Sequence, residues 1–269
     1  MSNPVNRTGM IGLGAMGFQM ARHMRGKGFD VAGFDVDAAA MERAKSQGIT
    51  TCDSAAAVGA RAEVVVIMVA TGQQVEEVIA GGLLGRLAPG SVICIASSVE
   101  PELCQRMAAL AQEKNIGVVD TPVVLGQEAA DNGSLVIYTG GEEKWVERAR
   151  PALECFGRVL HLGALGSGQI AKTINNMLLW ACMVANFECL SFAKKLGVDV
   201  PRLVPALMEG SGANWSLSRW GRSTGKWAEK DMDVALDMAQ AAKMPMPLAG
   251  LVDQLVKTIN QEKMKALLS

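Results

Sequence analysis

The feature that most constrains this chain is a glycine pattern close to its start. The pattern has the spacing G-x-G-x-x-G, and an acidic residue follows about twenty positions later. Its members are Gly12, Gly14, Ala15, Met16 and Gly17, followed by Asp35. The first glycine allows a tight turn out of a strand, the second lets the backbone approach phosphates, and the third lets a helix pack closely. The pattern therefore predicts a dinucleotide site in which phosphates face a helix N-terminus.

The residues around the glycines support this prediction, which matters because 29 glycines produce such spacings by chance. A short apolar run ends at Ile11, residues 16–24 have helical periodicity, and residues 31–34 form a second apolar run that Asp35 follows directly. This order predicts strand, turn, helix, strand and an acidic residue where a ribose would lie. The alternative is a glycine-rich turn in another kind of α/β protein.

The first 160 residues alternate between patterns typical of strands and of helices, which indicates a doubly wound parallel sheet of the Rossmann type. Residues 64–69 form a continuous β-branched run, as expected of a buried parallel strand. The other expected strands are 91–95, 117–120, 135–138 and 158–160, and the expected helices are 38–47, 73–79, 101–114 and 142–153.

The second part of the chain has a different character. Residues 166–195 contain no proline, and their apolar residues follow one helical period, which predicts an unusually long helix. Further helices are expected at 201–208, 226–242 and 248–265. We therefore expect a dinucleotide-binding domain over residues 1–163 and, over residues 164–269, a connecting helix with a small all-helical domain. Because open α/β sheets bind ligands at the carboxyl ends of their strands, we expect the active site between the two domains.

Charge and apolar run lengths exclude several classes of partner. The net charge is −1, with −4 over residues 1–160 and +3 over 161–269. Nothing therefore indicates nucleic acid as a partner, and the mildly basic second half fits an anionic substrate. Residues 1–8 are polar, which argues against a signal peptide. The longest apolar runs, 64–70 and 177–185, are shorter than the ~20 residues that cross a bilayer. We therefore expect a soluble, cytoplasmic protein.

The cysteines and histidines do not indicate a metal site. The six cysteines have no C-x-x-C spacing, and most lie in apolar segments, which is typical of reduced thiols in the core of a cytosolic protein. The two histidines, His23 and His161, lie in no catalytic pattern, and we expect them to be structural or exposed.

One cluster of polar residues near the start of the long helix indicates chemistry. Lys172 is followed by Asn175 and Asn176, so both amides share its face of an otherwise apolar helix. Such a cluster needs a polar counterpart, and a bound substrate oxygen would supply one. The alternative is that the Lys172 ammonium extends to solvent and the amides bind neighbouring helical turns.

Four motifs, in register along essentially the whole chain, resemble those of the β-hydroxyacid dehydrogenases, the family that includes 3-hydroxyisobutyrate dehydrogenase. The residues 12–17 are similar to the family's nucleotide fingerprint, and 120–123 to the start of its substrate motif D-x-P-V-S-G-G. The residues 166–176 are similar to its G-x-G-x-x-x-K-x-x-N-N helix, and 230–231 to its K-D pair. The resemblance implies that Lys172 is the catalytic proton donor and acceptor and that Asn176 helps to hold the substrate. A lysine with an ordinary pKa near ~10.4 is a poor base at neutral pH, and we expect partial burial to lower that pKa.

The substrate motif is where this chain departs from the family. The family's Ser-Gly-Gly reads Val124-Leu125-Gly126 here, so a hydroxyl and a flexible glycine have become two bulky aliphatic residues. The resemblance implies that this loop contacts the substrate carboxylate, for which Gly126 can still supply a backbone N–H. We expect a substrate that is larger, less polar or anchored differently. The substrate-binding residues expected from the resemblance are Val123, Val124, Gly126, Asn176, Lys230 and Asp231; Lys230 can also be read as a surface residue paired with an aspartate.

The residue expected beside the adenosine ribose indicates which cofactor is used. Asp35 can accept hydrogen bonds from both hydroxyls of the NAD ribose and would repel the 2′-phosphate of NADP, and Asp37 adds a second negative charge. Family members that use NADP tend to carry Asn-Arg at this place. We therefore expect NAD rather than NADP. Val69 and Ser97 follow expected strands and are further candidates for cofactor binding; Ser97 can also belong to a simple polar turn.

The chain is thus predicted to be an NAD-dependent oxidoreductase that transfers a hydride between the nicotinamide and a β-hydroxyacid or a related alcohol or aldehyde. Two alternatives stay open at this point: an imine reductase on the same fold, which usually lacks the lysine, and a dinucleotide-binding protein without catalysis. The long apolar helix has more hydrophobic surface than one chain covers, and family members pair through this region. We therefore expect a homodimer or a homotetramer.

Overall fold

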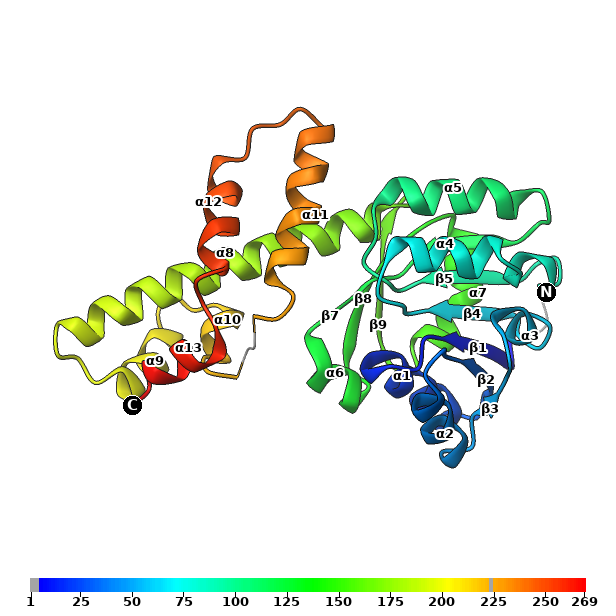
Figure 1. The fold of residues 1–269 in the computed structure, drawn as a ribbon, viewed down its shortest axis with the longest axis horizontal. Coiled ribbons are helices and arrows are strands. Elements are labelled where there is room, and N and C mark those ends of the chain that lie inside the picture. The colour runs from blue at the N-terminus through cyan, green and yellow to red at the C-terminus, as the bar shows by residue number, and fades with distance from the viewer. Residues whose placement is uncertain (1–4, 223–224) are drawn as a thin grey trace. The chain divides into compact units, whose positions relative to one another are not determined.

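The computed structural model describes residues 5–222 and 225–269, so residues 1–4 of the polar start lie outside the described part. By their internal contacts the residues form two compact units, Met1–Lys172 and Thr173–Ser269 (Figure 1). The domain boundary expected between residues 163 and 164 stays a prediction.

The first unit is built on a nine-stranded sheet in the order β3-β2-β1-β4-β5-β6-β8-β7, with β9 paired to β8. The strands β1 to β6 pair in parallel, as do β8 and β9, whereas β8 is antiparallel to β6 and to β7. The predicted doubly wound parallel sheet is confirmed, with an antiparallel addition. The strands are β1 (Arg7–Ile11), β2 (Asp30–Phe34), β3 (Thr50–Thr51), β4 (Val64–Ile67), β5 (Val92–Ile95), β6 (Gly117–Asp120), β7 (Val123–Val124), β8 (Leu135–Gly140) and β9 (Gly157–Gly163).

Helices cover both faces of the sheet, because successive residues of its buried strands face opposite sides. One core cluster contains Val64 and Val66 of β4 and the other contains Val65 and Ile67. The first face is covered by α1 (Ala15–Gly26), α2 (Ala38–Ser46), α6 (Gly126–Asn132) and α7 (Glu143–Leu153). The second is covered by α3 (Ala55–Gly59), α4 (Gly72–Ala80), the short 3₁₀ turn η1 (Leu83–Gly85) and α5 (Pro101–Gln112) (Figure 1).

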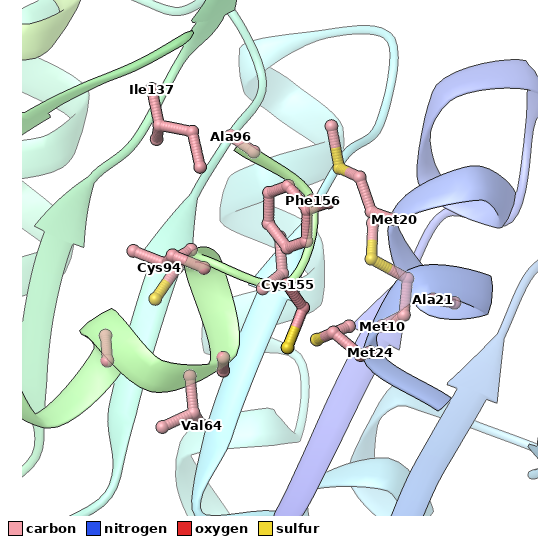
Figure 2. Packing of buried hydrophobic residues seen from close by; sticks show 14 of the residues in the cluster. Met10, Met20, Ala21, Met24, Val64, Cys94, Ala96, Ile137, Cys155 and Phe156 are labelled. Carbon is pink, nitrogen blue, oxygen red and sulfur yellow. The ribbon is translucent and has the colours of Figure 1, made fainter. Parts of the chain in front are cut away.

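The first of these clusters fixes α1 against the sheet. Figure 2 shows part of it, with Met20 and Met24 of α1, Met10 of β1 and Phe156, which follows α7. All four side chains are at most 1% exposed. Burying an apolar side chain of this size stabilises the fold by about 1.5–3 kcal/mol, so α1 is held firmly against the sheet.

The second unit consists of helices alone in its described residues. The helices are α8 (Ser167–Lys195), which begins in the first unit, α9 (Val200–Met208), α10 (Trp215–Ser218), α11 (Ala228–Ala241), α12 (Pro247–Val256) and α13 (Gln261–Ala266). The single helix expected over 248–265 is wrong. Asn260 interrupts it, because its side chain accepts a hydrogen bond from Lys263 N at 2.9 Å and thereby starts a new helix.

The helix α8 provides one side of the core of this unit. Trp180, Met183, Val184 and Leu190 are buried in a cluster with residues of α9 to α13. By length and composition alone α8 is long and apolar enough to cross a membrane, contrary to the expectation from run length, and 28% of its most apolar window is buried. The same test also selects core helices of water-soluble proteins, and four α8 side chains lie in such a core.

Candidate functional site

The turn between β1 and α1 requires two of its three glycines for packing. Gly12 has a φ of +89°, and an added Cβ there would collide with the Met68 carbonyl oxygen. An added Cβ on Gly17 would collide with the Gly12 carbonyl oxygen and lie 2.7 Å from Met10 Cε. At Gly14, by contrast, an added Cβ meets no protein atom within 4 Å. The backbone at Gly14 is thus open to a ligand, as the pattern predicts for a pyrophosphate.

The start of α1 suits an anion. Gly14 is the N-cap residue and offers no side-chain oxygen to the first turn, and that turn carries no acidic residue. The N–H groups of Ala15 and Met16 belong to this first turn, where the helix dipole favours negative charge. These residues therefore fit the pyrophosphate of a dinucleotide by their chemistry.

Asp35 is tied to the glycine turn by its carboxylate. Leu13 N donates to Asp35 Oδ2 at 2.6 Å, and Asp37 N donates to Asp35 Oδ1 at 2.9 Å. Each oxygen keeps a second lone-pair direction for a ribose hydroxyl. The carboxylate is partly exposed at the end of β2. The structure thus places Asp35 beside the turn that the pattern assigned to the cofactor.

Arg43 lies at the same turn, which the sequence reasoning did not predict. Its Nη2 atom donates to Leu13 O at 2.6 Å, and its guanidinium carbon lies 4.7 Å from the centre of the Phe18 ring. The structure brings Arg43 to the glycine turn because α2 packs against the same face as α1.

Val69 and Ser97 come together at the carboxyl ends of β4 and β5. The Ser97 hydroxyl accepts a hydrogen bond from Val69 N at 2.8 Å, and Ser97 is buried. The two loops that follow these neighbouring strands are therefore joined at the edge of the sheet where open α/β folds bind ligands.

A buried carboxylate at the end of β6 holds the start of α8. Asp120 Oδ1 accepts from Gly166 N at 2.7 Å and Asp120 Oδ2 accepts from Gln169 N at 2.8 Å. Burial raises the pKa of Asp120, and the backbone N–H donors act in the opposite direction. Gly168 is required here, because an added Cβ would lie 2.6 Å from both Asp120 Oδ2 and Tyr138 O. The G-x-G of the helix motif thus has a packing reason.

Lys172 lies just beyond this anchored turn. It is partly buried, in the second turn of α8, and it is three residues after Gln169 and four before Asn176. Residues with these spacings share one face of a helix. The structure therefore presents Lys172 and Asn176 on the same face of one continuous helix, as the sequence predicts.

Asn176 is held by Asp231, which joins two residues predicted to bind substrate. The Asn176 Nδ2 atom donates to Asp231 Oδ2 at 2.8 Å, and the Trp180 indole nitrogen donates to the same oxygen at 3.0 Å. The Asn176 Oδ1 atom accepts from Asn175 Nδ2 at 3.1 Å. Asp231 thus orients the amide. Its neighbour Lys230 is partly buried at the start of α11.

The divergent substrate motif contains an unusual backbone conformation. Val123 and Val124 form the buried strand β7, and Leu125 then adopts φ +83° and ψ 0°. A bulky residue in the left-handed region costs about 1–3 kcal/mol. Gly126 follows with a φ of +74° and begins α6. The backbone of Leu125 thus has a conformation that glycine adopts without cost. The leucine side chain at this position is 37% exposed.

α6, which the sequence reasoning missed, joins this loop to α1. Gln127 Nε2 donates to Ala15 O at 3.1 Å, and His23 Nε2 lies 3.0 Å from Ala130 O. His161 Nε2 lies 2.9 Å from Gly141 O. Both histidine rings thus bind backbone carbonyls.

The cysteines are free thiols, and three of them are buried. Burial raises the pKa of Cys94 and of Cys104 far above the ordinary thiol range, and it also raises the pKa of Cys155. Cys189 is exposed, so the expectation of core thiols does not hold for it. Among residues 5–222 and 225–269, no three His, Cys, Asp or Glu side chains gather as metal ligands.

Sequence models of two protein families match consecutive parts of the chain. Residues 7–166 match the NAD-binding domain of 6-phosphogluconate dehydrogenase. Residues 166–267 match the NAD-binding domain of NADP-dependent 3-hydroxyisobutyrate dehydrogenase. A 3-hydroxyisobutyrate dehydrogenase of Pseudomonas aeruginosa is 34% identical over 91% of this chain and 89% of its own length. The chain belongs to the β-hydroxyacid dehydrogenase family.

Other members agree with this assignment. An NAD-dependent L-serine dehydrogenase of Pseudomonas aeruginosa is 30% identical over 93% of this chain and 90% of its own length. A solved 3-hydroxyisobutyrate dehydrogenase of Mycobacterium tuberculosis with L-serine superposes with a TM-score of 0.89 at 26% identity, covering 98% of this chain and all of that chain. An imine reductase of Streptomyces aurantiacus has a TM-score of 0.68 at 16% identity over 98% of this chain and 99% of its own, which shows a shared fold alone.

As a member of the β-hydroxyacid dehydrogenase family, the chain is an NAD-binding oxidoreductase of the hydroxyacid type. The structure shows where each predicted site residue lies. It adds Arg43 and Gln169, which sequence reasoning missed, and the hydrogen bond from Trp180 to Asp231. Their partners lie 30 or more residues away in the chain, so no local pattern indicates them.

Proposed function

We propose that this chain oxidises a β-hydroxyacid with NAD, and that Lys172 exchanges the proton of the substrate hydroxyl. NAD, when bound, accepts the hydride from the carbon that carries the hydroxyl. Lys172 takes up the hydroxyl proton during oxidation and returns it during reduction, so it acts as general base and general acid. The observation that supports this role is the shared helix face of Lys172 and Asn176, with the first turn of that helix held by buried Asp120.

We assign substrate orientation to Asn176, held by Asp231. A carboxylate fixes the Asn176 amide from one side, which leaves the remaining amide hydrogen for a substrate oxygen. Lys230 offers a positive charge to an anionic substrate. The second half of the chain, with its small net positive charge, is consistent with such a substrate.

The loop of Val123, Val124 and Gly126 supplies the specificity for the rest of the substrate. Gly126 retains a backbone N–H that a carboxylate can accept from, whereas Val124 provides no hydroxyl. With Leu125 partly exposed beside them, an aliphatic wall replaces the polar contact of the family motif. We propose a substrate with a larger or less polar substituent than those of typical members.

We further propose that NAD is preferred to NADP. The Asp35 carboxylate is fixed by two backbone N–H donors, so it cannot turn away from a 2′-phosphate without losing both. Gly14, Ala15 and Met16 present their backbone to the pyrophosphate, and Gly12 and Gly17 give the turn its shape. Val69 and Ser97 lie on the loops that bind the rest of the cofactor. Arg43 does not reverse this preference, because its guanidinium is engaged by Leu13 O and by the Phe18 ring.

We propose that the protein is soluble and cytoplasmic and forms a homodimer or homotetramer through the exposed face of α8. Ile174, Leu178 and Phe192 are between 52% and 65% exposed, at spacings that place them along one side of the helix, and Leu196, which directly follows α8, is 65% exposed. Such an apolar surface is typical of an association site, and a second copy of this chain is the partner that its family membership suggests.

A turnover panel tests the proposed reaction. The protein is mixed with NAD and with 3-hydroxyisobutyrate, L-serine or a β-hydroxyacid that carries a larger apolar substituent, and NADH formation is followed. In the reverse direction it is mixed with NADH and a cyclic imine. We expect NADH from at least one hydroxyacid and no consumption with the imine. Imine reduction alone would favour the imine reductase alternative, and NADH binding without any turnover would favour a binding protein.

A further inference from the structure

We infer that Gln169 is a positioning residue that couples the loop at Ser97 to the helix that carries Lys172. The inference rests on the proposed function, because it concerns how Lys172 is aligned for that reaction. It assigns a role to a side chain that none of the four sequence motifs explains.

Both polar side-chain atoms of Gln169 and its backbone N are hydrogen-bonded. Its Nε2 atom donates to Ser97 O at 2.8 Å, and its Oε1 atom accepts from Val99 N at 3.1 Å. Its backbone N donates to Asp120 Oδ2 at 2.8 Å. Gln169 is 1% exposed and Asp120 is fully buried, so these bonds are shielded from water.

The bonds connect the ends of three neighbouring strands. Ser97 follows β5, and its hydroxyl also receives the hydrogen bond from Val69 N after β4. Asp120 ends β6, which pairs with β5. The Gln169 side chain thus joins α8 to the Ser97–Val99 loop by two hydrogen bonds. A displacement of the loop is transmitted to the first turn of the helix.

The position of Gln169 makes this connection relevant to Lys172. The two residues are three apart, so fixing one fixes the rotation of the helix face that carries the other. A side-chain tip lies about 5–6 Å from the helix axis. A rotation of about 10° would therefore move the Lys172 ammonium by about 1 Å, and a misplacement of this size can lower turnover about 100-fold.

A purely structural role for Gln169 would predict that losing its buried hydrogen bonds lowers stability alone. The folded variant would then have the wild-type kcat. Gln169→Met separates the two, because it keeps an unbranched side chain and removes both amide contacts. Val146→Ala is the matched control: Val146 is fully buried in α7, so the change lowers stability without touching the network.

Amide hydrogen exchange, measured with and without NADH, tests the coupling without turnover. In the wild type we expect NADH to slow exchange both in residues 97–99 and in residues 167–172. In Gln169→Met we expect slowing in the loop alone, whereas Val146→Ala should behave as the wild type. Slowing of residues 167–172 in Gln169→Met, or its absence in the wild type, would overturn the inference. A wild type that does not bind NADH would overturn the proposed function itself, and the inference with it.

Kinetics provide the second readout. With NAD and the hydroxyacid that the wild type oxidises best, we expect Gln169→Met to lose about 10- to 100-fold in kcat. The primary deuterium isotope effect on kcat should rise, because hydride transfer becomes the slow step. Val146→Ala should keep both values. If Gln169→Met does not fold, Gln169→Glu serves instead, since it retains the acceptor for Val99 N and opposes Ser97 O with a carboxylate. An unchanged kcat and isotope effect in a folded variant would contradict the inference.

Discussion

Replacing Asp35 with asparagine tests two consequences of one carboxylate. The change keeps the shape of the side chain and removes its charge. In the wild type, Asp35 Oδ2 accepts from Leu13 N at 2.6 Å and Asp35 Oδ1 accepts from Asp37 N at 2.9 Å. Asparagine has a single acceptor oxygen, so its NH₂ group must face one of these two N–H donors.

The two consequences have different magnitudes. A hydrogen bond to a charged group contributes about 1.5–3 kcal/mol, and Asp35 is partly exposed, so we expect Asp35→Asn to lower stability by about 1–2 kcal/mol. Unit charges ~4 Å apart interact by about 4 kcal/mol near a protein surface. Salt screening reduces the repulsion of a 2′-phosphate to about 2–3 kcal/mol, which corresponds to about 30- to 150-fold in affinity. The ratio of the NADPH Kd to the NADH Kd should therefore fall by about 30- to 150-fold in Asp35→Asn.

Fluorescence titration with NADH and NADPH measures the ratio of their Kd values, and urea unfolding measures the stability. Asp37→Ser is the matched control. Asp37 caps α2 by accepting from Ala39 N at 3.0 Å, and serine can also cap, so the variant removes a nearby charge alone. It should change the ratio much less than Asp35→Asn does. A wild type that prefers NADPH, or an Asp35→Asn variant with the wild-type ratio, would refute the reasoning.

Three further predictions concern the rest of the molecule. Asp120→Asn should lower stability by about 1–3 kcal/mol, because a buried backbone N–H at the start of α8 loses its acceptor. Since burial raises the pKa of Asp120, wild-type stability falls as the pH rises from the ordinary to the raised pKa, so the stability difference between wild type and variant, measured by urea unfolding, should narrow over that window. A difference that widens with pH would contradict the raised pKa of Asp120. Leu125→Gly removes the cost of the left-handed backbone and the aliphatic wall, so kcat/KM should shift toward small polar hydroxyacids such as L-serine; an unchanged ratio against an apolar hydroxyacid would argue against a role in specificity. Leu178→Asp should weaken self-association in sedimentation experiments, and Leu110→Asp, at another exposed leucine, should not; equal effects of the two variants would count against α8 as the interface.

The local patterns of the sequence predicted most of the first unit. The glycine turn, the β-branched strand β4 and the Pro101 start of α5 each depend on residues adjacent in the chain, and periodicity reports such features directly. The strand β7 and the seven-residue helix α6 are too short for either period to be visible. The division of the last helix depends on the cap at Asn260, which apolar periodicity does not detect.

The sequence indicated candidate residues for the site, whose roles stay predictions, and it did not indicate their contacts. The pairing of Lys172 with Asn176 follows from helical spacing. The pairing of Asn176 with Asp231 joins residues 55 positions apart, and only the fold shows it. The same holds for Gln169, whose partners lie about 70 residues earlier, on a different element.

The most direct test of the account is the turnover of Lys172→Ala, measured beside its affinity for NADH. We predict that NAD reduction by the best hydroxyacid is lost, that the Kd for NADH stays within a few-fold of the wild type, and that an added primary amine restores part of the turnover by supplying the missing base. Turnover near the wild-type level without added amine would contradict the central claim that Lys172 moves the substrate proton.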